Sequence, residues 1–333
     1  MTLALVSIAA LAVGAWFLTS LLLDTADIVR VLRRVDPRWF VACFAFEITS
    51  YLAYAHALDE FTRQGSGPRI GARGAGRLML ASLGGTRIAP FAGAGGLAVM
   101  IWAFRQMGLD SRDAFARVLG LNILVFAVFG LIGWFAALSA LLIPAAGRGV
   151  PGAMSATWAI GIPACIAAAC WLNRRSARAG VRQRSRAAQS ILDGIEAVGH
   201  IARRARRHLR LILSCAIYWL ADIGCLMLAL TSVDGRVRVV PVCLAYATGY
   251  VAMMAPLPTG GFGAVEAAVT ASLVGVGTPV ADALAAVAIW RAFNFWLPTA
   301  PALVALVRLP GLGREFREQH ANSCPDSLTR GRF

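Results

Sequence analysis

Apolar residues along this chain come in long uninterrupted blocks, and they do not alternate with polar residues. A helix of about 20 apolar residues crosses a hydrocarbon core roughly 30 Å thick. Six blocks have this length, at 3 to 23, 39 to 58, 118 to 143, 153 to 172, 211 to 230 and 282 to 308. The pattern therefore predicts an all-α polytopic membrane protein with about six full transmembrane helices.

Two further apolar stretches, 78 to 107 and 239 to 277, are each broken in the middle by Pro and Gly. Proline has no amide hydrogen and clashes with the preceding turn, so neither stretch forms one continuous helix. We predict two re-entrant hairpins in their place. The residues of the breaks are Pro90, Gly93, Gly95 and Gly96 in the first, and Pro256, Pro258, Gly260, Gly261 and Gly263 in the second.

Composition supports lipid as the solvent of nearly the whole chain. Hydrophobic residues make up 58% and charged residues 15% of the 333 residues, whereas soluble domains carry about 25% charged residues. We predict a single transmembrane domain over 1 to 310. The remainder, 311 to 333, is predicted to be a short, polar and disordered tail.

The net charge of +15 comes from 32 basic residues that are all Arg. Most of them flank hydrophobic segments, where the positive-inside bias and anionic lipid headgroups explain them, so no nucleic-acid partner is expected. Eleven Arg lie between 174 and 210, which predicts the main cytoplasmic loop there. With this loop inside, the two broken hairpins enter from opposite sides and form an inverted pseudo-repeat. The Arg-containing segment 24 to 38 conflicts with this topology, and the orientation of the N-terminus stays open.

A weak internal repeat accompanies the two breaks. Aligning Pro90 with Pro256 matches several neighbours, and downstream Asp113 and Asp282 each precede by nine residues a polar position, Asn122 and Arg291. Paired interrupted segments are typical of transporter binding sites, because unwound backbone exposes helix ends near the midplane. The alternative is that Gly and Pro are simply frequent in membrane helices.

Arg291 and Glu266 are the most informative charged residues inside apolar segments. A charge at the centre of a membrane helix costs about 2.5 to 3.5 kcal/mol, so Arg291 requires a partner. Glu266 follows the second break, in the first turn of a half-helix whose positive end favours a carboxylate. Arg291 either pairs with Glu266 to hold the broken helix, or faces a hydrated cavity and binds a phosphate headgroup. Both roles are compatible.

Other polar residues in apolar segments are secondary candidates. Glu47 and Asp222 are intramembrane acids that either relay protons or serve an inward structural role. Asn122, Asn294 and Arg87 are further candidates for substrate binding, although amides in membrane helices more often join helices by hydrogen bonds.

No catalytic motif, metal-ligand cluster or cofactor-binding motif is found in the sequence. The pattern of a Ser-His-Asp triad, HExxH and the P-loop are missing, and six of the seven Cys lie in apolar segments as small hydrophobes. We therefore expect a protein that is not an enzyme and that carries no cofactor and no metal.

Two stretches carry a family resemblance: 258 to 268, read as P-x-G-G-x-G-x-x-E, and 290 to 298, read as aromatic-Arg-x-x-x-x-W-x-P. Together they resemble the lysylphosphatidylglycerol synthase transmembrane region family. The resemblance implies the flippase-like domain of the multiple peptide resistance factor, without its synthase domain. The first half departs from the family pattern, since uncharged residues stand at the first break and Leu121 and Asn122 replace a Glu-Arg pair.

Pattern and resemblance together favour a multi-pass, flippase-like lipid transporter in the cytoplasmic membrane. Its expected cargo is a phospholipid, a glycolipid or a polyprenyl-linked lipid, with an anionic headgroup or polyprenyl phosphate at the site. The alternative is a membrane scaffold or accessory subunit for a lipid-modifying enzyme or a glycosyltransferase. The oligomeric state stays open.

Overall fold

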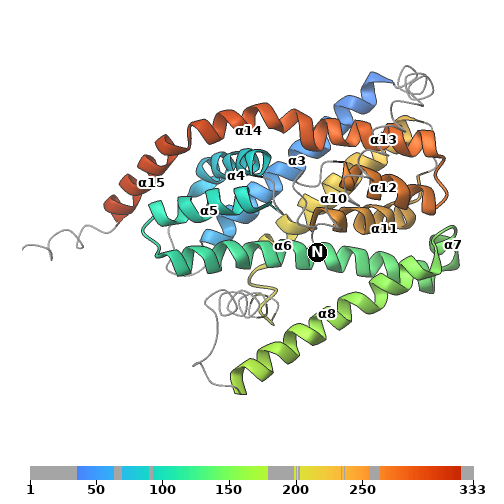
Figure 1. Cartoon of the computed structure of the whole chain (residues 1–333), viewed down its shortest axis with the longest axis horizontal. Coiled ribbons are helices and arrows are strands. Elements are labelled where there is room, and N and C mark those ends of the chain that lie inside the picture. Colours follow the sequence, from blue (N-terminus) through green and yellow to red (C-terminus); the bar gives the residue numbers. More distant parts are fainter. Residues whose placement is uncertain are drawn as a thin grey trace, which may run out of the picture.

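The computed structural model describes residues 36–63, 70–89, 93–178, 199, 201, 203–233, 235, 237–254 and 263–323. Within these residues every regular element is a helix (Figure 1). They are α3 (Pro37–Thr62), α4 (Gly71–Ile88), α5 (Ala94–Gln106), α6 (Ser111–Leu142), α7 (Pro144–Gly147), α8 (Gly152–Arg178), α10 (Leu209–Ser232), α11 (Val239–Tyr250), η3 (Val251–Met254), α12 (Ala264–Gly275), α13 (Val280–Arg291), η4 (Ala292–Trp296), α14 (Leu297–Val307) and α15 (Leu309–Ser323).

Five of the described helical stretches are long and apolar enough to cross a membrane: α3, α6, α8, α10 and the run from α13 through η4 to α14. Each contains one predicted span, which confirms the all-α polytopic membrane fold. Helices suit this solvent because they satisfy every backbone hydrogen bond within one segment. The remaining predicted span, 3 to 23, lies outside the described residues.

Local sequence explains where the long helices begin. Asp36 caps α3 by accepting a hydrogen bond from the backbone N–H of Arg38 at 2.9 Å, and Pro37 stands at the first helical position. The hydrogen bond from the Arg38 side chain also lowers the pKa of the Asp36 carboxyl. Asp110 caps α6 in the same way, accepting from the backbone N–H of Asp113 at 2.7 Å.

Both interrupted stretches form pairs of short helices, as the Pro and Gly residues predict. The first gives α4 and α5, and the second gives α11 with η3, followed by α12. The second helix of each pair starts at a glycine with a left-handed backbone, Gly93 at φ 78° and Gly263 at φ 82°. Only glycine adopts such a φ without strain, which is why it stands at each break. The predicted break residues Pro90, Pro256, Pro258, Gly260 and Gly261 lie outside the described residues.

The two helix pairs open toward opposite ends of the molecule. At one end, α15 contacts the start of α4 through an Arg77–Glu315 ion pair and the end of α5 through Arg317 and Gln106. At the other end, Arg238 before α11 donates to the carbonyl oxygens of Arg148 and of Val276, just after α12. Figure 1 shows α15 and α7 at these two ends. The inverted orientation of the pairs agrees with the predicted pseudo-repeat.

The structure also corrects the alignment of that repeat. Gly93 and Gly263, which start α5 and α12, are 170 residues apart, whereas Pro90 and Pro256 are 166 apart. The starts of α6 and α13, Ser111 and Val280, are 169 residues apart. The helix starts therefore align at offsets of 169 and 170 residues, three to four more than the offset of the proline match. In this alignment Asn122 stands at the place of Arg291 and Gly96 at the place of Glu266.

The predicted disordered tail is wrong for the part of it that the structure describes. Residues 309–323 form α15, whose Leu312 and Phe316 are buried and whose Glu315 pairs with Arg77. The predicted domain boundary at 310 therefore falls inside the packed structure. The prediction failed because the polar face of this amphipathic helix dominates its composition, while a few apolar residues are enough to dock it.

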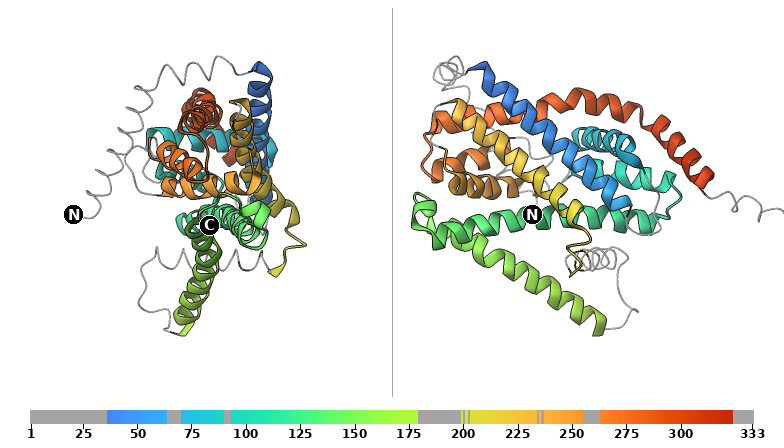
Figure 2. Two further views of the ribbon diagram at one scale, coloured as in Figure 1. Left: turned by 90° about the vertical axis from the view of Figure 1, so that its right-hand side faces the viewer. Right: turned by 180° about the vertical axis from the view of Figure 1, so that it is seen from behind.

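Two features of packing position the site. Helices α3 and α10 lie side by side along much of their length (Figure 2), close enough that a Cβ added at Gly224 would lie 2.4 Å from the Phe46 ring. Helix α8 instead diverges from the bundle, and only 6% of its apolar span is buried. Among the described residues, one side is thus tightly packed by α3 and α10, whereas α6 and α8 diverge from each other.

Candidate functional site

Arg291 lies at the end of α13, where the helix widens into the π-helical turn η4. Its side chain is buried, with 4% of the residue exposed, and Nε donates to Oε1 of Glu266 at 2.6 Å. Glu266 is also buried, and its Oε2 accepts from the backbone N–H of Gly263 at 2.7 Å. The predicted ion pair is therefore present, and it ties the start of α12 to α13.

This ion pair leaves part of the Arg291 guanidinium available. Nη1 donates to Oδ1 of Asn294 across 3.4 Å, and Nη2 is buried with no hydrogen-bond partner in the described part of the chain. A buried N–H that lacks an acceptor costs about 1 to 3 kcal/mol, more when the group is charged. The Arg291 guanidinium is thus incompletely satisfied by the described residues.

The two predicted intramembrane acids meet at Asn294. Its Nδ2 is 3.2 Å from Oε1 of Glu47 and 3.1 Å from Oδ1 of Asp222. Asp222 also accepts from the Tyr246 hydroxyl at 2.6 Å and from Trp290 Nε1 at 2.5 Å. Glu47 is less well satisfied, because its Oε2 has no partner among the described residues. The close packing of α3 on α10 brings these acids together.

Arg87, near the end of α4, reaches the same place from the first helix pair. Its guanidinium carbon lies 3.6 Å above the centre of the Phe295 ring, and Nη2 donates to the Phe295 carbonyl oxygen at 3.3 Å. Arg291 faces the same ring, with its guanidinium carbon 4.5 Å from the centre. Cation–π attraction to one ring helps to hold two like charges close together. Nε of Arg87 is buried and unpartnered within the described structure.

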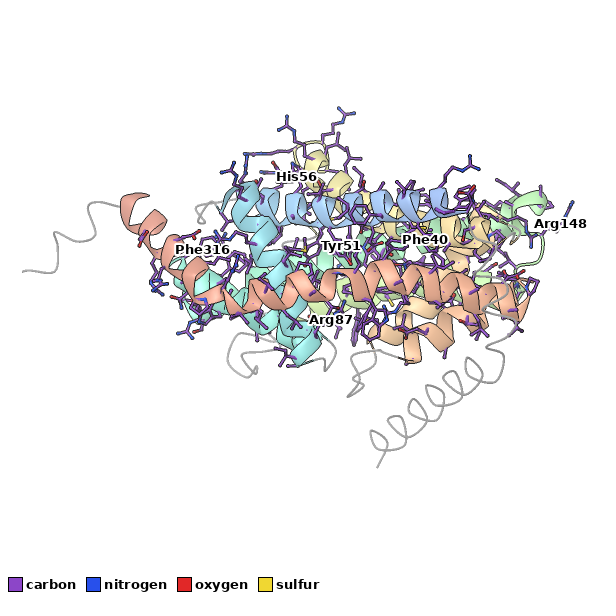
Figure 3. All side chains as sticks on the ribbon, turned by 90° about the horizontal axis from the view of Figure 1, so that it is seen from above. Phe40, Tyr51, His56, Arg87, Arg148 and Phe316 are labelled. Carbon is purple, nitrogen blue, oxygen red and sulfur yellow. The ribbon has the colours of Figure 1, made fainter. Side chains whose placement is uncertain are left out.

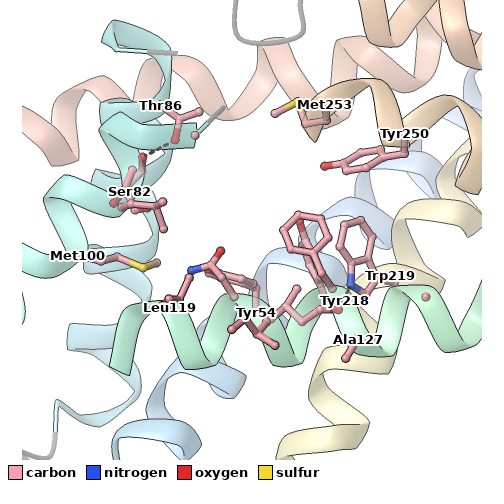
Figure 4. A pocket seen from close by; sticks show the side chains of 18 of the residues that line it. Tyr54, Ser82, Thr86, Met100, Leu119, Ala127, Tyr218, Trp219, Tyr250 and Met253 are labelled. Carbon is pink, nitrogen blue, oxygen red and sulfur yellow. Dashed lines mark hydrogen bonds between the residues drawn. The ribbon is translucent and has the colours of Figure 1, made fainter. Parts of the chain in front are cut away.

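These groups border a cavity of about 950 Å³. Four of the five predicted substrate-binding residues line it, namely Arg87, Arg291, Asn294 and Asn122, whereas no Asp or Glu is found among its described lining residues. In Figure 4, Ser82 and Thr86 of α4 stand on one side, Tyr250 and Trp219 on the other, and α6 between them. Figure 3 places Arg87 and Tyr51 near the middle of the long axis.

The cavity is strongly amphipathic. Its arginine end is polar, whereas its wall toward α6 and α8 is apolar and includes Phe126, Ile162 and Ile166. Ile166 and Cys165 of α8 are exposed on the surface of the molecule and also line the cavity. The apolar end therefore lies at the diverging helix α8.

The structure assigns different positions to the predicted site residues. Glu266 does not line the cavity and instead accepts the Arg291 Nε hydrogen bond from outside the lining. Asn122 lines it, but its Nδ2 donates to the carbonyl oxygen of Val118 in its own helix at 2.9 Å. Gly93 and Gly96 also line it, and a Cβ added at Gly95 would lie 2.1 Å from the carbonyl oxygen of Gly85, so these glycines set the close approach of α4 and α5.

Sequence reasoning missed the hydroxyl groups of the cavity wall. Tyr51 and Tyr54 stand three residues apart on α3, and Ser82 and Thr86 stand four apart on α4, so each pair lies on one helix face. Tyr51 donates to the backbone oxygen of Asn294 at 2.6 Å. The helical spacing of polar residues in otherwise apolar segments was the signal that would have identified them.

Comparison with known families places the chain. The family described as lysylphosphatidylglycerol synthase TM region matches residues 5–302. The chain belongs to this family. The match includes both helix pairs, Arg87 and Arg291, and it confirms the resemblance carried by the two motifs. A comparison with curated proteins gives no significant match. The chain is thus a multi-pass membrane protein of a lipid-related family.

Proposed function

We propose that this protein is a flippase-like transporter that moves a lipid across the cytoplasmic membrane and catalyses no reaction. The observation that carries the proposal is the amphipathic cavity between two oppositely oriented helix pairs, with the half-buried Arg87 and the buried Arg291 at one end and an exposed apolar wall at the other. A lipid has the same division into a polar headgroup and apolar chains.

Energetics support a functional role for the buried charges. Each charge retained in the hydrocarbon region costs about 2.5 to 3.5 kcal/mol, so membrane proteins keep such groups mainly along substrate or ion pathways. Arg87 and Arg291 both face the cavity, each with an unpartnered N–H in the described structure. A headgroup that fills these positions would be held near the middle of the molecule while its chains extend toward α8.

The inverted arrangement suggests how such a site opens to either side. In transporters with inverted repeats, one repeat rocks against the other around a fixed central site. Here α4 and α5 open toward the α15 end, and α11 and α12 toward the α7 end. Since the sequence contains no P-loop, we expect movement of the lipid to be passive or coupled to an ion gradient. A phospholipid, a glycolipid and a polyprenyl-linked lipid all meet these requirements.

The test is a proteoliposome assay with a fluorescent anionic lipid and the full chain. We expect Arg291→Ala to reduce flipping at least tenfold. Because this change leaves Glu266 buried and unpaired, the double variant Arg291→Met with Glu266→Met is included, since apolar replacement of a whole buried pair is often tolerated. Unchanged flipping in a folded variant would remove Arg291 from the mechanism.

The alternative function is a membrane scaffold for a lipid-modifying enzyme, and the exposed arginines before α10 favour it: Arg203, Arg204, Arg206 and Arg207. Replacing all four by Gln serves as the matched control of the flipping assay. If the protein is a transporter, flipping is retained. If it is a scaffold, recovery of the partner enzyme is lost and no variant changes lipid movement.

A further inference from the structure

Arg87 and Arg291 come from different repeats, yet their guanidinium groups share one aromatic ring. Their central carbons lie 3.6 Å and 4.5 Å from the centre of Phe295. Each has one N–H, Nε of Arg87 and Nη2 of Arg291, that is buried and has no acceptor within the described structure. Two orphaned donors beside one cavity point to one ligand that brings two acceptor oxygens.

The charges around the cavity define the sign of that ligand. The charge of Arg291 is balanced by Glu266 at 2.6 Å, whereas the hydrogen bond of Arg87 goes to a neutral backbone carbonyl. Among the described lining residues Arg87 and Arg291 are charged and no acid is present. The lining surface itself is thus positive, whereas Glu47 and Asp222 contact Asn294 from outside the lining. The low-polarity surroundings of the lining strengthen its attraction to an anion.

The asymmetry of the two repeats explains why the excess charge exists. In the second repeat the equivalent positions hold the ion pair Glu266–Arg291, but in the first they hold Gly96 and Asn122. Gly96 brings no carboxylate that would balance Arg87, and it lines the cavity. Asn122 donates to its own helix. The first repeat therefore contributes open volume to the cavity, and its Arg87 contributes a positive charge that no carboxylate at these positions balances.

We propose that Arg87 and Arg291 together bind one phosphate group, each donating to a different non-bridging oxygen, so that the cavity selects anionic phosphate-bearing lipids. The inference rests on the proposed function, because it assumes that the cavity receives a lipid. Guanidinium groups suit this role because their rigid donors match phosphate oxygens. Lipids whose headgroup lacks phosphate, or carries a compensating cation, bind more weakly.

Binding is measured on the purified full chain in neutral detergent, by the quenching of intrinsic tryptophan fluorescence with a brominated-chain lipid. Three such lipids are compared: phosphatidylglycerol, phosphatidylcholine and diacylglycerol. We expect phosphatidylglycerol to bind at least tenfold more tightly than diacylglycerol, with phosphatidylcholine between them. Equal affinity for all three overturns the proposal.

The variant that tests the site is Arg87→Gln, because Arg87 has no ion pair within the described structure whose loss would unfold the protein. We expect a loss of about tenfold or more in phosphatidylglycerol affinity, the size of one charge-assisted hydrogen bond, and no change for diacylglycerol. Arg105→Gln is the matched control, since Arg105 is exposed on α5 and carries the same charge. An equal loss in both variants, or none in Arg87→Gln, overturns the site.

A last arm separates lipid from free phosphate. Inorganic phosphate at millimolar concentration is expected to displace phosphatidylglycerol only weakly, because it lacks chains that fill the apolar wall. Displacement at the same concentration as the lipid overturns the lipid assignment and supports a soluble phosphate ligand. The binding assay does not depend on transport, so the two proposals can fail separately. Selective binding without flipping refutes only the proposed function. Flipping that is insensitive to Arg87→Gln refutes only this phosphate site.

Discussion

At the scale of single residues, the interior of this protein separates well-satisfied charges from incompletely satisfied ones. Asp222 is fully buried and accepts hydrogen bonds from Tyr246, Trp290 and Asn294. Glu47 is equally buried, yet one of its oxygens has no partner in the described structure. Full satisfaction indicates a structural role, and an orphaned atom indicates a group that is free to change partners.

This difference makes a prediction about stability. We expect Asp222→Asn to destabilise the protein by about 1 to 3 kcal/mol, because the single amide oxygen replaces only one carboxylate oxygen. Either Tyr246 or the pair Trp290 and Asn294 then loses its acceptor. Glu47→Gln should cost less than about 1 kcal/mol, since it retains an oxygen for Asn294. Thermal unfolding in detergent measures both. Equal destabilisation by the two variants would contradict the proposed difference.

At the scale of elements, helix α8 differs from its neighbours. It packs on α6 but diverges along its length, and it presents Cys165 and Ile166 both to the surface and to the cavity. Small residues and one Pro, Pro163, lie near this position, and a proline removes one backbone hydrogen bond from the helix. For the proposed transporter we therefore expect lipid chains to enter between α6 and α8.

Cysteine labelling tests this assignment. A bulky apolar maleimide on Cys165 and Cys170, which both line the cavity, should reduce lipid flipping severalfold by filling the gap. The double variant Cys165→Ser with Cys170→Ser retains Cys324 as a control for labelling elsewhere. Its flipping should be insensitive to the reagent. Equal inhibition of both proteins would place the effect outside α8.

At the scale of the whole molecule, the arginines are distributed unevenly between the two ends. Among the described residues, nine arginines lie at the α15 end: Arg63, Arg73, Arg77, Arg105, Arg112, Arg117, Arg308, Arg314 and Arg317. The opposite end carries Arg38, Arg148 and Arg238. The positive-inside rule therefore predicts that the α15 end faces the cytoplasm. The cavity then lies between two aqueous faces that differ in charge.

The orientation is checked by labelling introduced cysteines in intact cells, with the native cysteines replaced by Ser. We expect a membrane-impermeant maleimide to label Arg148→Cys directly, and Arg77→Cys only after permeabilisation, because both positions are exposed but lie at opposite ends. The reverse order would invert the topology. Labelling of both without permeabilisation would contradict a transmembrane arrangement of α4.

The sequence by itself determined the features that depend on local composition. The length of each apolar run predicts the length of a membrane helix, and Pro and Gly predict where a helix is interrupted, so the spans and both interruptions were predictable. The Arg bias likewise predicts which end of the molecule faces the cytoplasm. The free-energy cost of placing the charged side chains of Arg291 and Glu266 in hydrocarbon also identified these residues from the sequence.

Only the tertiary structure decided which of these groups meet. Asn294 lies 247 residues from Glu47 and 72 from Asp222, and Arg87 lies 208 from Phe295, so no local pattern reports their contacts. The docking of α15 and the exposed flank of α8 depend in the same way on distant partners. Hydropathy is a property of one segment, whereas pairing, burial and cavity shape are properties of several segments at once.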